Sequence, residues 1–406
     1  MFKSLKISTI NCKIKYKNRD DLLLVLFDKD VAIAGVFTDS ATRAPSVIHC
    51  QKNIVNHLAR ALIVNAGNAN AFTGSKGRKI VSNVVKKIAE TIDCDVSKIF
   101  MSSTGVIGEL FDDKLIIDNI PKMVNNAQFS PIMIEKAAKS IMTTDTKMKL
   151  IFKKCKIGNS DIELFGFIKG SGMISPNMAT MLGYIFTNAN IDGLILQELL
   201  NQATNISFNN ISVDGDRSTN DTILAFATND INHLKINNIN DDAFADFKEA
   251  FFDLAITMAK MVVIDGEGAT KLIELDVVNA KNKKQAKNVA MSVINSPLIK
   301  SAIAAADPNW GRIIMAIGKA DNKINPNKIK LKIGNFLITE NGARIADYNE
   351  QLVHQYLKNQ EVKINIDLGY NSNKYANKIA KNDNKIRVWG CDLNESYVTI
   401  NKDYRS

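Results

Sequence analysis

Position 180 places a threonine hydroxyl at the junction between a loop and a buried segment. The stretch KGSGMISPNMAT (169–180) carries two glycines and Pro176, and an apolar run over residues 181–186 follows at once. A hydroxyl is a weak nucleophile until a base takes its proton. If Thr180 began a chain, its own α-amino group could be that base, because the pKa of such a group is roughly 7.7–8. Thr180 is therefore a candidate nucleophile for acyl transfer.

Freeing that amine requires a break in the Ala179–Thr180 peptide bond. The threonine hydroxyl can attack the carbonyl of its own preceding peptide bond, and hydrolysis of the resulting ester completes the cut. Such an attack needs unusual backbone, which Gly170, Gly172 and Pro176 can supply. The chemistry alone leaves a second interpretation open, in which Thr180 is merely the first residue of a strand.

Six further loops share this composition, being rich in Gly, Asn, Asp, Ser and Thr although apolar segments flank them. They are NAGNANAFTG (65–74), MSSTGVIGE (101–109), MTTDTK (142–147), SVDGDRSTNDT (212–222), DGEGATK (265–271) and ADPNWGR (306–312). Each loop alone could be an ordinary turn. Their number favours a site built from loops that a rigid scaffold holds in place.

Motifs for metals, nucleotides and histidine-based catalysis are missing from the sequence. There is no GxGxxG after a strand, no GxxxxGK[ST] and no HExxH. The stretch that starts at Asp214 resembles a calcium loop, but Thr219 stands where glycine is needed and Ala225 where an acid is needed. None of the four histidines lies in the polar loops. We therefore expect no metal site and no resident cofactor.

Composition limits the class of protein. A chain of 406 residues is too long for one ordinary core and suggests two or three domains. The net charge of +10 would suit an acidic partner, but the densest basic run, 279–288, has no aromatic residue for base stacking. We expect no nucleic-acid partner.

Targeting signals and cysteine pattern bear on the compartment. No apolar run approaches the roughly 20 residues that span a bilayer, and the N-terminal stretch lacks the apolar core of a secretion signal. Five scattered cysteines without a CxxC pattern fit a reducing compartment. The expectation is a cytoplasmic protein without a membrane partner.

The periodicity of the chain predicts an α/β fold that becomes strand-rich towards the C-terminus. Strands are expected at 21–28, 31–37, 61–65, 222–228, 271–278, 328–339, 361–368, 385–391 and 396–401. Helices are expected at 78–90, 132–142 and 283–306, the last interrupted by Pro297. These elements must position the polar loops.

Taken in order, the loops resemble the ornithine acetyltransferase family, the bifunctional glutamate N-acetyltransferase/amino-acid acetyltransferases. The blocks that carry the resemblance are STGVIG, KGSGMISPNMATML, SVDGDRSTNDT, DGEGATK, ADPNWGR and the C-terminal YVTINKDYRS. PNMATML is the most specific of them, and the resemblance covers essentially the whole chain. One departure is the last residue, Ser406, where the family more often has Thr.

The resemblance implies a layered αββα sandwich, similar to that of the L-aminopeptidase D-Ala-esterases, cut between Ala179 and Thr180. The α chain would be 1–179 and the β chain 180–406, and two of each would assemble. Thr180 would take the acetyl group of N2-acetylornithine and pass it to L-glutamate in a ping-pong cycle of arginine biosynthesis. Acetyl-CoA is a candidate co-substrate, because bifunctional members accept it as a donor.

The resemblance also assigns roles to residues. Thr104 (hydroxyl) and Gly105 (backbone N–H) would form the oxyanion hole for the tetrahedral intermediate. The substrate-binding residues would be Thr143, Lys169, Thr180, Glu267, Asn401 and Ser406. A cation such as Lys169 and an anion such as Glu267 together suit a zwitterionic amino acid.

Two other functions remain open at this stage. One is an N-terminal-nucleophile aminopeptidase of the related fold, which would also cut itself but would hydrolyse peptides and ignore acetyl acceptors. The other is a non-catalytic basic binding protein, which would stay a single chain and bind polyanions in a salt-dependent way.

Overall fold

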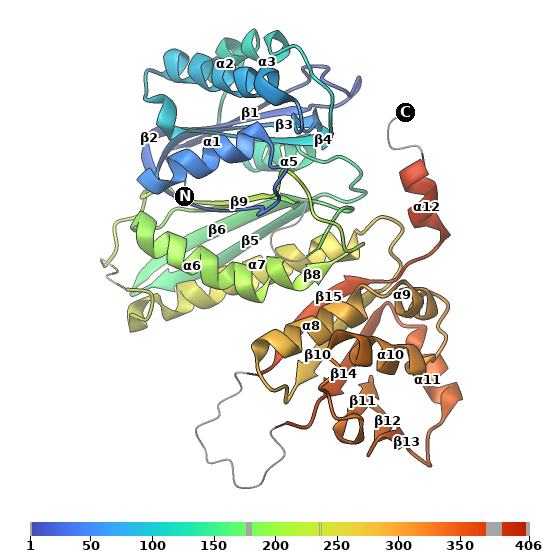
Figure 1. Ribbon diagram of the computed structural model, residues 1–406. Coiled ribbons are helices and arrows are strands. Elements are labelled where there is room, and N and C mark those ends of the chain that lie inside the picture. The colour runs from blue at the N-terminus through green and yellow to red at the C-terminus, as the bar shows by residue number, and fades with distance from the viewer. Residues whose placement is uncertain (1, 176–180, 235, 237, 371–383, 403–406) are drawn as a thin grey trace. The chain divides into compact units, whose positions relative to one another are not determined.

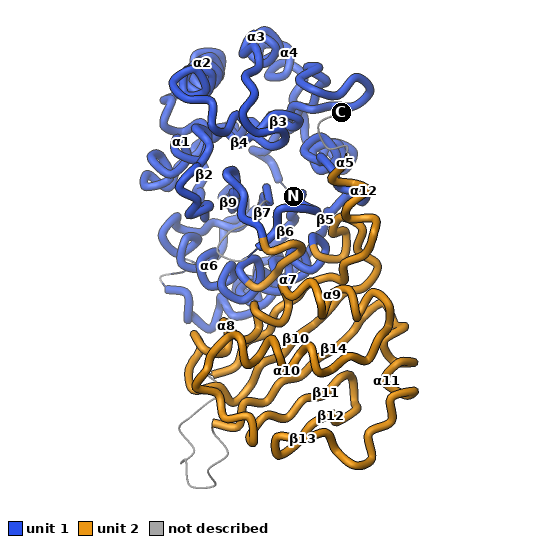
Figure 2. Tube along the Cα trace, turned by 45° about the vertical axis from the view of Figure 1, so that its right-hand side comes forward, with its two compact units in different colours: residues 1–209, 216–262 blue, residues 210–215, 263–406 orange. Residues whose placement is uncertain are grey.

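The computed structural model describes residues 2–175, 181–234, 236, 238–370 and 384–402 (Figure 1). The chain divides into two compact units. Unit 1 contains residues 1–209 and 216–262, and unit 2 contains residues 210–215 and 263–406 (Figure 2). Each unit is a mixed sheet with helices, so the predicted α/β class is confirmed. The expected cut after residue 179 falls inside unit 1 rather than between the units.

In the described part of unit 1, eight strands form one sheet with the order β4-β3-β2-β9-β7-β6-β5, and β1 pairs with β2. Their bounds are β1 Leu5–Ile10, β2 Leu22–Phe37, β3 Leu58–Asn68, β4 Ile99–Val106, β5 Lys149–Ile157, β6 Ser160–Lys169, β7 Leu182–Thr187 and β9 Thr222–Ala227. The strands expected at 21–28 and 31–37 are one continuous strand, β2. Its pairing with β3 shifts register between Leu26 and Val31.

Helices cover both faces of this sheet (Figure 1). They are α1 Pro45–Asn53, α2 Gly74–Ile92, α3 Lys114–Ile117, α4 Ile120–Asn125, α5 Pro131–Ser140, α6 Gly193–Ile206 and α7 Ala245–Ile264. In β2, Leu22 and Leu24 pack into a cluster with α2, α3 and α4, whereas Leu23 and Val25 pack into another with α5. Burial on both faces explains why the strand is a continuous apolar run rather than an alternating one.

In the described part of unit 2, seven strands form the second sheet, in the order β13-β12-β11-β14-β10-β15-β8. Their bounds are β8 Ile211–Ser212, β10 Leu272–Val278, β11 Lys330–Ile333, β12 Phe336–Glu340, β13 Ala343–Arg344, β14 Glu361–Asp367 and β15 Ile386–Cys391. The helices are α8 Lys283–Ile294, α9 Pro297–Ala304, α10 Trp310–Ala320, α11 Glu350–Leu357 and α12 Glu395–Lys402. Pro297 therefore starts a new helix instead of bending one, in keeping with its lack of an N–H.

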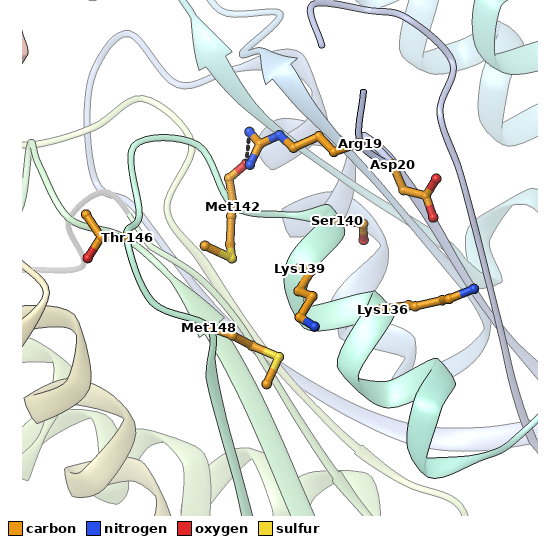
Figure 3. A pocket seen from close by; sticks show the side chains of 8 residues that line it. All are labelled: Arg19, Asp20, Lys136, Lys139, Ser140, Met142, Thr146 and Met148. Atoms are coloured by element: carbon orange, nitrogen blue, oxygen red, sulfur yellow. Dashed lines mark hydrogen bonds between the residues drawn. The ribbon is translucent and has the colours of Figure 1, made fainter. Parts of the chain in front are cut away.

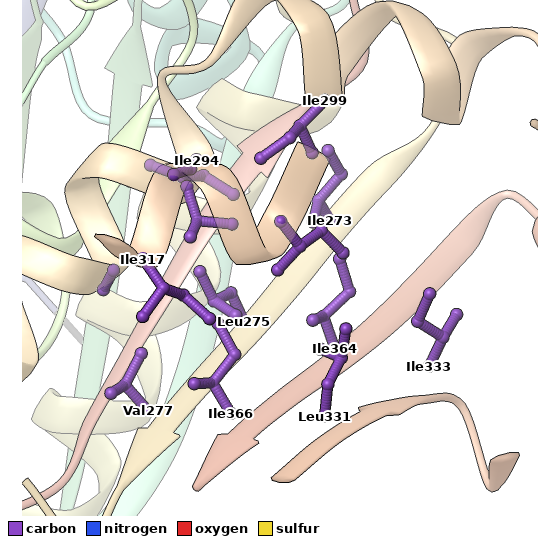
Figure 4. Close-up of a cluster of buried hydrophobic side chains, with 14 of the residues drawn as sticks. Ile273, Leu275, Val277, Ile294, Ile299, Ile317, Leu331, Ile333, Ile364 and Ile366 are labelled. Carbon is purple, nitrogen blue, oxygen red and sulfur yellow. The ribbon is translucent and has the colours of Figure 1, made fainter. Parts of the chain in front are cut away.

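The core of unit 2 forms where one face of its sheet meets the helices α8, α9 and α10. Figure 4 shows Ile273 and Leu275 of β10 packed with Ile294 of α8 and Ile317 of α10. Along β10 the buried apolar residues alternate with half-buried ones such as Glu274. This alternation is typical of a strand whose two faces have different surroundings.

The segment 328–339, expected as one strand, is the two paired strands β11 and β12, and one other expected strand is wrong. The segment expected to be a strand at 396–401 is the helix α12. Alternating residues such as Tyr397 and Thr399 suggest a strand, but none of the described residues of α12 is buried, and α12 pairs with no strand in either described sheet. A helix satisfies its backbone groups internally, and the side chain of Asn394 starts this one by accepting from the Ser396 N–H at 2.9 Å.

Two further findings concern membrane-spanning helices and the cysteine thiols. No helix in the described ranges has the length and apolar character needed to cross a membrane. All five cysteines are free, and burial raises the pKa of Cys12, Cys50 and Cys155 to about 12. These three cysteines are therefore neutral thiols at physiological pH, not nucleophiles.

Candidate active site

Three of the predicted site residues, Ala179, Thr180 and Ser406, lie outside the described residues. The structure does describe the strand that follows Thr180 and the two strands beside it. Strand β7 lies between β6 and β9, with Leu182 paired to Lys169 on one side and to Thr222 on the other. The end of β6 and the start of β9 therefore flank the beginning of β7.

Asp221 precedes β9 and holds the beginning of β7. Its side chain is fully buried, and its Oδ1 accepts a hydrogen bond of 3.0 Å from the N–H of Met181. The main chain adds a second link, since the Thr222 N–H donates to the Met181 carbonyl at 3.0 Å. Burial raises the pKa of Asp221 well above its usual range, although the Met181 N–H and the charge of Lys169 lower it. Sequence reasoning placed Asp221 in a site-like loop but assigned it no role.

The predicted oxyanion residues end strand β4. Thr104 and Gly105 pair with Ala66 and Gly67 of β3. Gly105 has a φ of +128°, and a Cβ there would lie 2.2 Å from the Gly67 carbonyl carbon. Only glycine fits this close approach of two backbones.

Asn220 connects the start of β9 with the end of β4. Its Nδ2 donates to the carbonyl of Ser103 at 2.8 Å and to the carbonyl of Ala69 at 2.7 Å. Asn220 is buried, and its Oδ1 accepts from the hydroxyl of Thr219. The neighbouring residues Asn220 and Asp221 thus bind the end of strand β4 and the beginning of strand β7. The signal in the sequence was a polar run, STND, directly before the apolar strand TILAFA.

Thr143 and Lys169, both predicted to bind substrate, lie together in unit 1. The Nζ of Lys169 donates to the Thr143 hydroxyl at 3.3 Å, and the side chain of Lys169 is buried. The residue before Thr143 is also held, because Arg19 donates to the Met142 carbonyl at 2.8 Å.

A pocket of about 570 Å³ borders this loop (Figure 3). It is lined by Arg19, Asp20, Lys136, Lys139, Ser140, Met142, Thr146 and Met148. The loop that carries Thr143 thus borders a concave surface that carries three basic side chains and one acidic one.

Glu267 and Asn401 lie together in unit 2. The Nδ2 of Asn401 donates to Oε2 of Glu267 at 2.7 Å, and Glu267 is buried. The loop after Glu267 touches α12 closely: Gly268 has a φ of +74°, and a Cβ there would lie 2.7 Å from the Tyr397 nitrogen. Asn394 also donates to the Gly268 carbonyl at 2.7 Å. The helix that replaced the expected strand therefore presents Asn401 to the carboxylate.

The fold and these two groups of residues define an α/β protein whose buried polar side chains gather at strand ends and loops, an arrangement typical of enzymes. The sequence matches the model of the ArgJ family over residues 6–406, and the chain belongs to this family. The arginine biosynthesis bifunctional protein ArgJ of Bartonella henselae is 40% identical over 402 residues, which is 99% of this chain and 95% of that protein. The protein of the same name from Mesorhizobium japonicum is 39% identical over 409 residues, 100% of this chain and 96% of its own.

Among solved structures, the arginine biosynthesis bifunctional protein ArgJ from Bacillus halodurans is 36% identical, with a TM-score of 0.49. That match covers 54% of this chain and 97% of the other. The enzymes of the ArgJ family are acetyltransferases of arginine biosynthesis, so the predicted class, an acyltransferase of that pathway, is confirmed.

Proposed function

We propose that the chain transfers the acetyl group of N2-acetylornithine to L-glutamate through an acetyl ester on Thr180, after cutting itself between Ala179 and Thr180. One observation carries the proposal. Residues 220 and 221 tie the strand that starts after Thr180 to the strand that ends in Thr104 and Gly105. A nucleophile and its oxyanion donors must be held at such a fixed distance.

In the proposed reaction, Thr180, Thr104 and Gly105 have different roles. The freed amine of Thr180 takes the proton of its hydroxyl, whose oxygen attacks the acetyl carbon. Thr104 and Gly105 stabilise the oxyanion, ornithine leaves with the proton, and glutamate then takes the acetyl group by the reverse steps. One amide replaces another, so the exchange needs no source of energy.

The same proposal gives each substrate-binding residue a chemical partner. Lys169, held beside Thr143, suits a substrate carboxylate. Glu267, oriented by Asn401, suits a cationic amine. Ser406 keeps its predicted role in binding at the chain end.

We also propose an assembly of two α chains (1–179) and two β chains (180–406) in the cytoplasm, with acetyl-CoA as a second donor. The pairing of strands in the sheet supports the proposal that the two chains stay associated after a cut. β6 and β7 are paired from Leu164↔Thr187 to Lys169↔Leu182, and these two strands lie on either side of the cut.

The word "bifunctional" in the relatives' names supports a second activity, for which acetyl-CoA is the proposed donor.

The test is the intact mass of the purified protein under denaturing conditions, followed by assays of acetyl exchange and peptide hydrolysis. We expect two masses, for 1–179 and 180–406, and exchange of acetyl from N2-acetylornithine to glutamate. Thr180→Ala should remain one uncut chain, whereas Thr143→Ala should still be cut. A single uncut mass for the unmodified protein, or peptide hydrolysis without exchange, would refute the proposal.

A further inference from the structure

A buried ion pair lies next to the loop that carries Thr143. The Nζ of Lys149 is 2.6 Å from Oδ1 of Asp145, and their side chains are 1% and 0% exposed. Lys149 begins strand β5 and is paired with Ile168, the residue before Lys169. None of the roles assigned so far uses this pair. Burying two charges is costly, so a pair of this kind calls for an explanation.

The Asp145 carboxylate joins the two segments that carry the substrate residues. Its Oδ2 accepts from the N–H of Thr143 at 2.9 Å, and its Oδ1 accepts from the N–H of Gly170 at 2.7 Å. Thr143 itself and the neighbour of Lys169 are thus anchored on one rigid group. A second link nearby joins the hydroxyls of Thr144 and Ser171 at 2.7 Å.

Charge decides how this anchor behaves. Burial raises the pKa of the Asp145 carboxyl, but the charges of Lys149 and Lys169, together with the hydrogen bonds from Lys149 and the Thr143 N–H, lower it to below its usual range. Asp145 is therefore an anion at neutral pH. A buried anion attracts the nearest cation strongly. Lys149 supplies that cation directly, while Lys169 donates to Thr143.

We infer that Asp145 is a positioning residue for acetyl transfer, and that Lys149 neutralises it so that Lys169 stays beside Thr143, the position from which it would bind the carboxylate of the amino-acid substrate. This inference rests on the proposed function of Thr143 and Lys169. Without Lys149, the carboxylate draws Lys169 away from Thr143, and substrate binding weakens. The Lys149–Asp145 ion pair would thereby influence the affinity for the substrate as well as the structure.

The test compares Lys149→Met, Asp145→Asn/Lys149→Met and the unmodified protein in steady-state acetyl exchange, with the KM for N2-acetylornithine and for glutamate measured separately. For Lys149→Met we expect both KM values to rise at least about tenfold, with kcat changed less than about threefold, as for loss of ground-state binding. The double variant removes both charges but loses one anchor hydrogen bond. Its KM values should therefore lie between those of the unmodified protein and those of Lys149→Met. Lys156→Met, an exposed lysine of the same strand, is the matched control and should leave KM unchanged.

Each outcome decides a separate point. Exchange by the unmodified protein together with wild-type KM values in Lys149→Met overturns the inference and leaves the proposed function intact. Absence of exchange in the unmodified protein overturns the proposed function, and the inference with it. If Lys149→Met fails to fold, the double variant decides, because replacing a whole buried pair is often tolerated. Wild-type KM values in the double variant would show that Asp145 does not position the loop.

Discussion

The side-chain amide of Asn401 donates a hydrogen bond of 2.7 Å to the carboxylate of Glu267, although 134 positions separate the two residues. Asn401 also donates to the Tyr397 carbonyl at 3.0 Å, one helical turn earlier. Two donor hydrogens of one amide are thus shared between its own helix and the carboxylate. Asn401 therefore sets the orientation of Glu267.

Replacing Asn401 by Ala should lower kcat/KM for acetyl exchange by about 10- to 100-fold, because a hydrogen bond to a charged group contributes about 1.5–3 kcal/mol. Val398→Ala, an exposed residue of the same helix, should behave as the unmodified protein. Glu267→Gln combined with Asn401→Ala should cost less than the sum of the two single changes, because they share one interaction. Strict additivity of the two changes would contradict this coupling.

Replacing Thr104 by Ala should lower kcat by about 100- to 1000-fold, the usual cost of one lost oxyanion donor. Thr104→Ser retains the hydroxyl and should keep most of the activity. Both variants can be compared by rapid-quench measurement of the first acetyl transfer. Equal rates for the Ala and Ser variants would remove the hydroxyl from the mechanism.

Replacing Asn220 by Leu should destabilise unit 1, because the carbonyls of Ala69 and Ser103 lose their buried donor. The free energy of unfolding should fall by about 2–6 kcal/mol, since each of the two buried carbonyls left without its partner costs about 1–3 kcal/mol. Urea denaturation at one protein concentration measures the change. Asn201→Leu, at an exposed position of α6, should change little. A stable but inactive Asn220→Leu would instead indicate a role confined to the oxyanion strand.

Asp221 predicts a pH dependence of stability. Its pKa is raised in the folded state above the unfolded value of roughly 3.9, so the folded state binds more protons between the two values. The contribution of Asp221 to the free energy of unfolding is fully present below pH ~4, and it is lost as the pH rises through the pKa of Asp221 in the folded state. Asp221→Asn keeps an acceptor for the Met181 N–H but removes the ionisation. Unfolding free energies measured from pH 5 to 8 should fall more with pH in the unmodified protein than in this variant, and parallel curves would reject the prediction.

The secondary structure was partly accessible from local patterns, although β5, β6, α6 and α7 were not predicted. Strand β2 and helix α2 carry runs that only a buried strand or an amphipathic helix explains. The strand prediction for 396–401 was wrong for a physical reason: its aromatic and β-branched residues favour a strand, but a strand needs a neighbouring strand for its backbone hydrogen bonds. Whether a neighbouring strand is present depends on segments that are distant in the sequence.

The substrate residues remain predictions from family resemblance, which specific motifs made possible, whereas Asp145, Asn220 and Asp221 received no role. All three are buried polar residues in loops, and in a sequence such residues are indistinguishable from turn formers. Their importance comes from the groups they reach. Asp145 contacts Gly170 and Asn220 contacts Ser103, 25 and 117 positions away.

The sequence by itself indicated the α/β class and the family and named the candidate site residues, because those depend on residue type and short-range order. Only the tertiary structure decided which of them meet: Lys169 with Thr143, and Glu267 with Asn401. It also decided what holds them, namely the buried carboxylates and amide that connect strand ends. Hydrogen bonds and buried charges act over a few ångströms of space whatever the distance along the chain, and only folding sets that spacing.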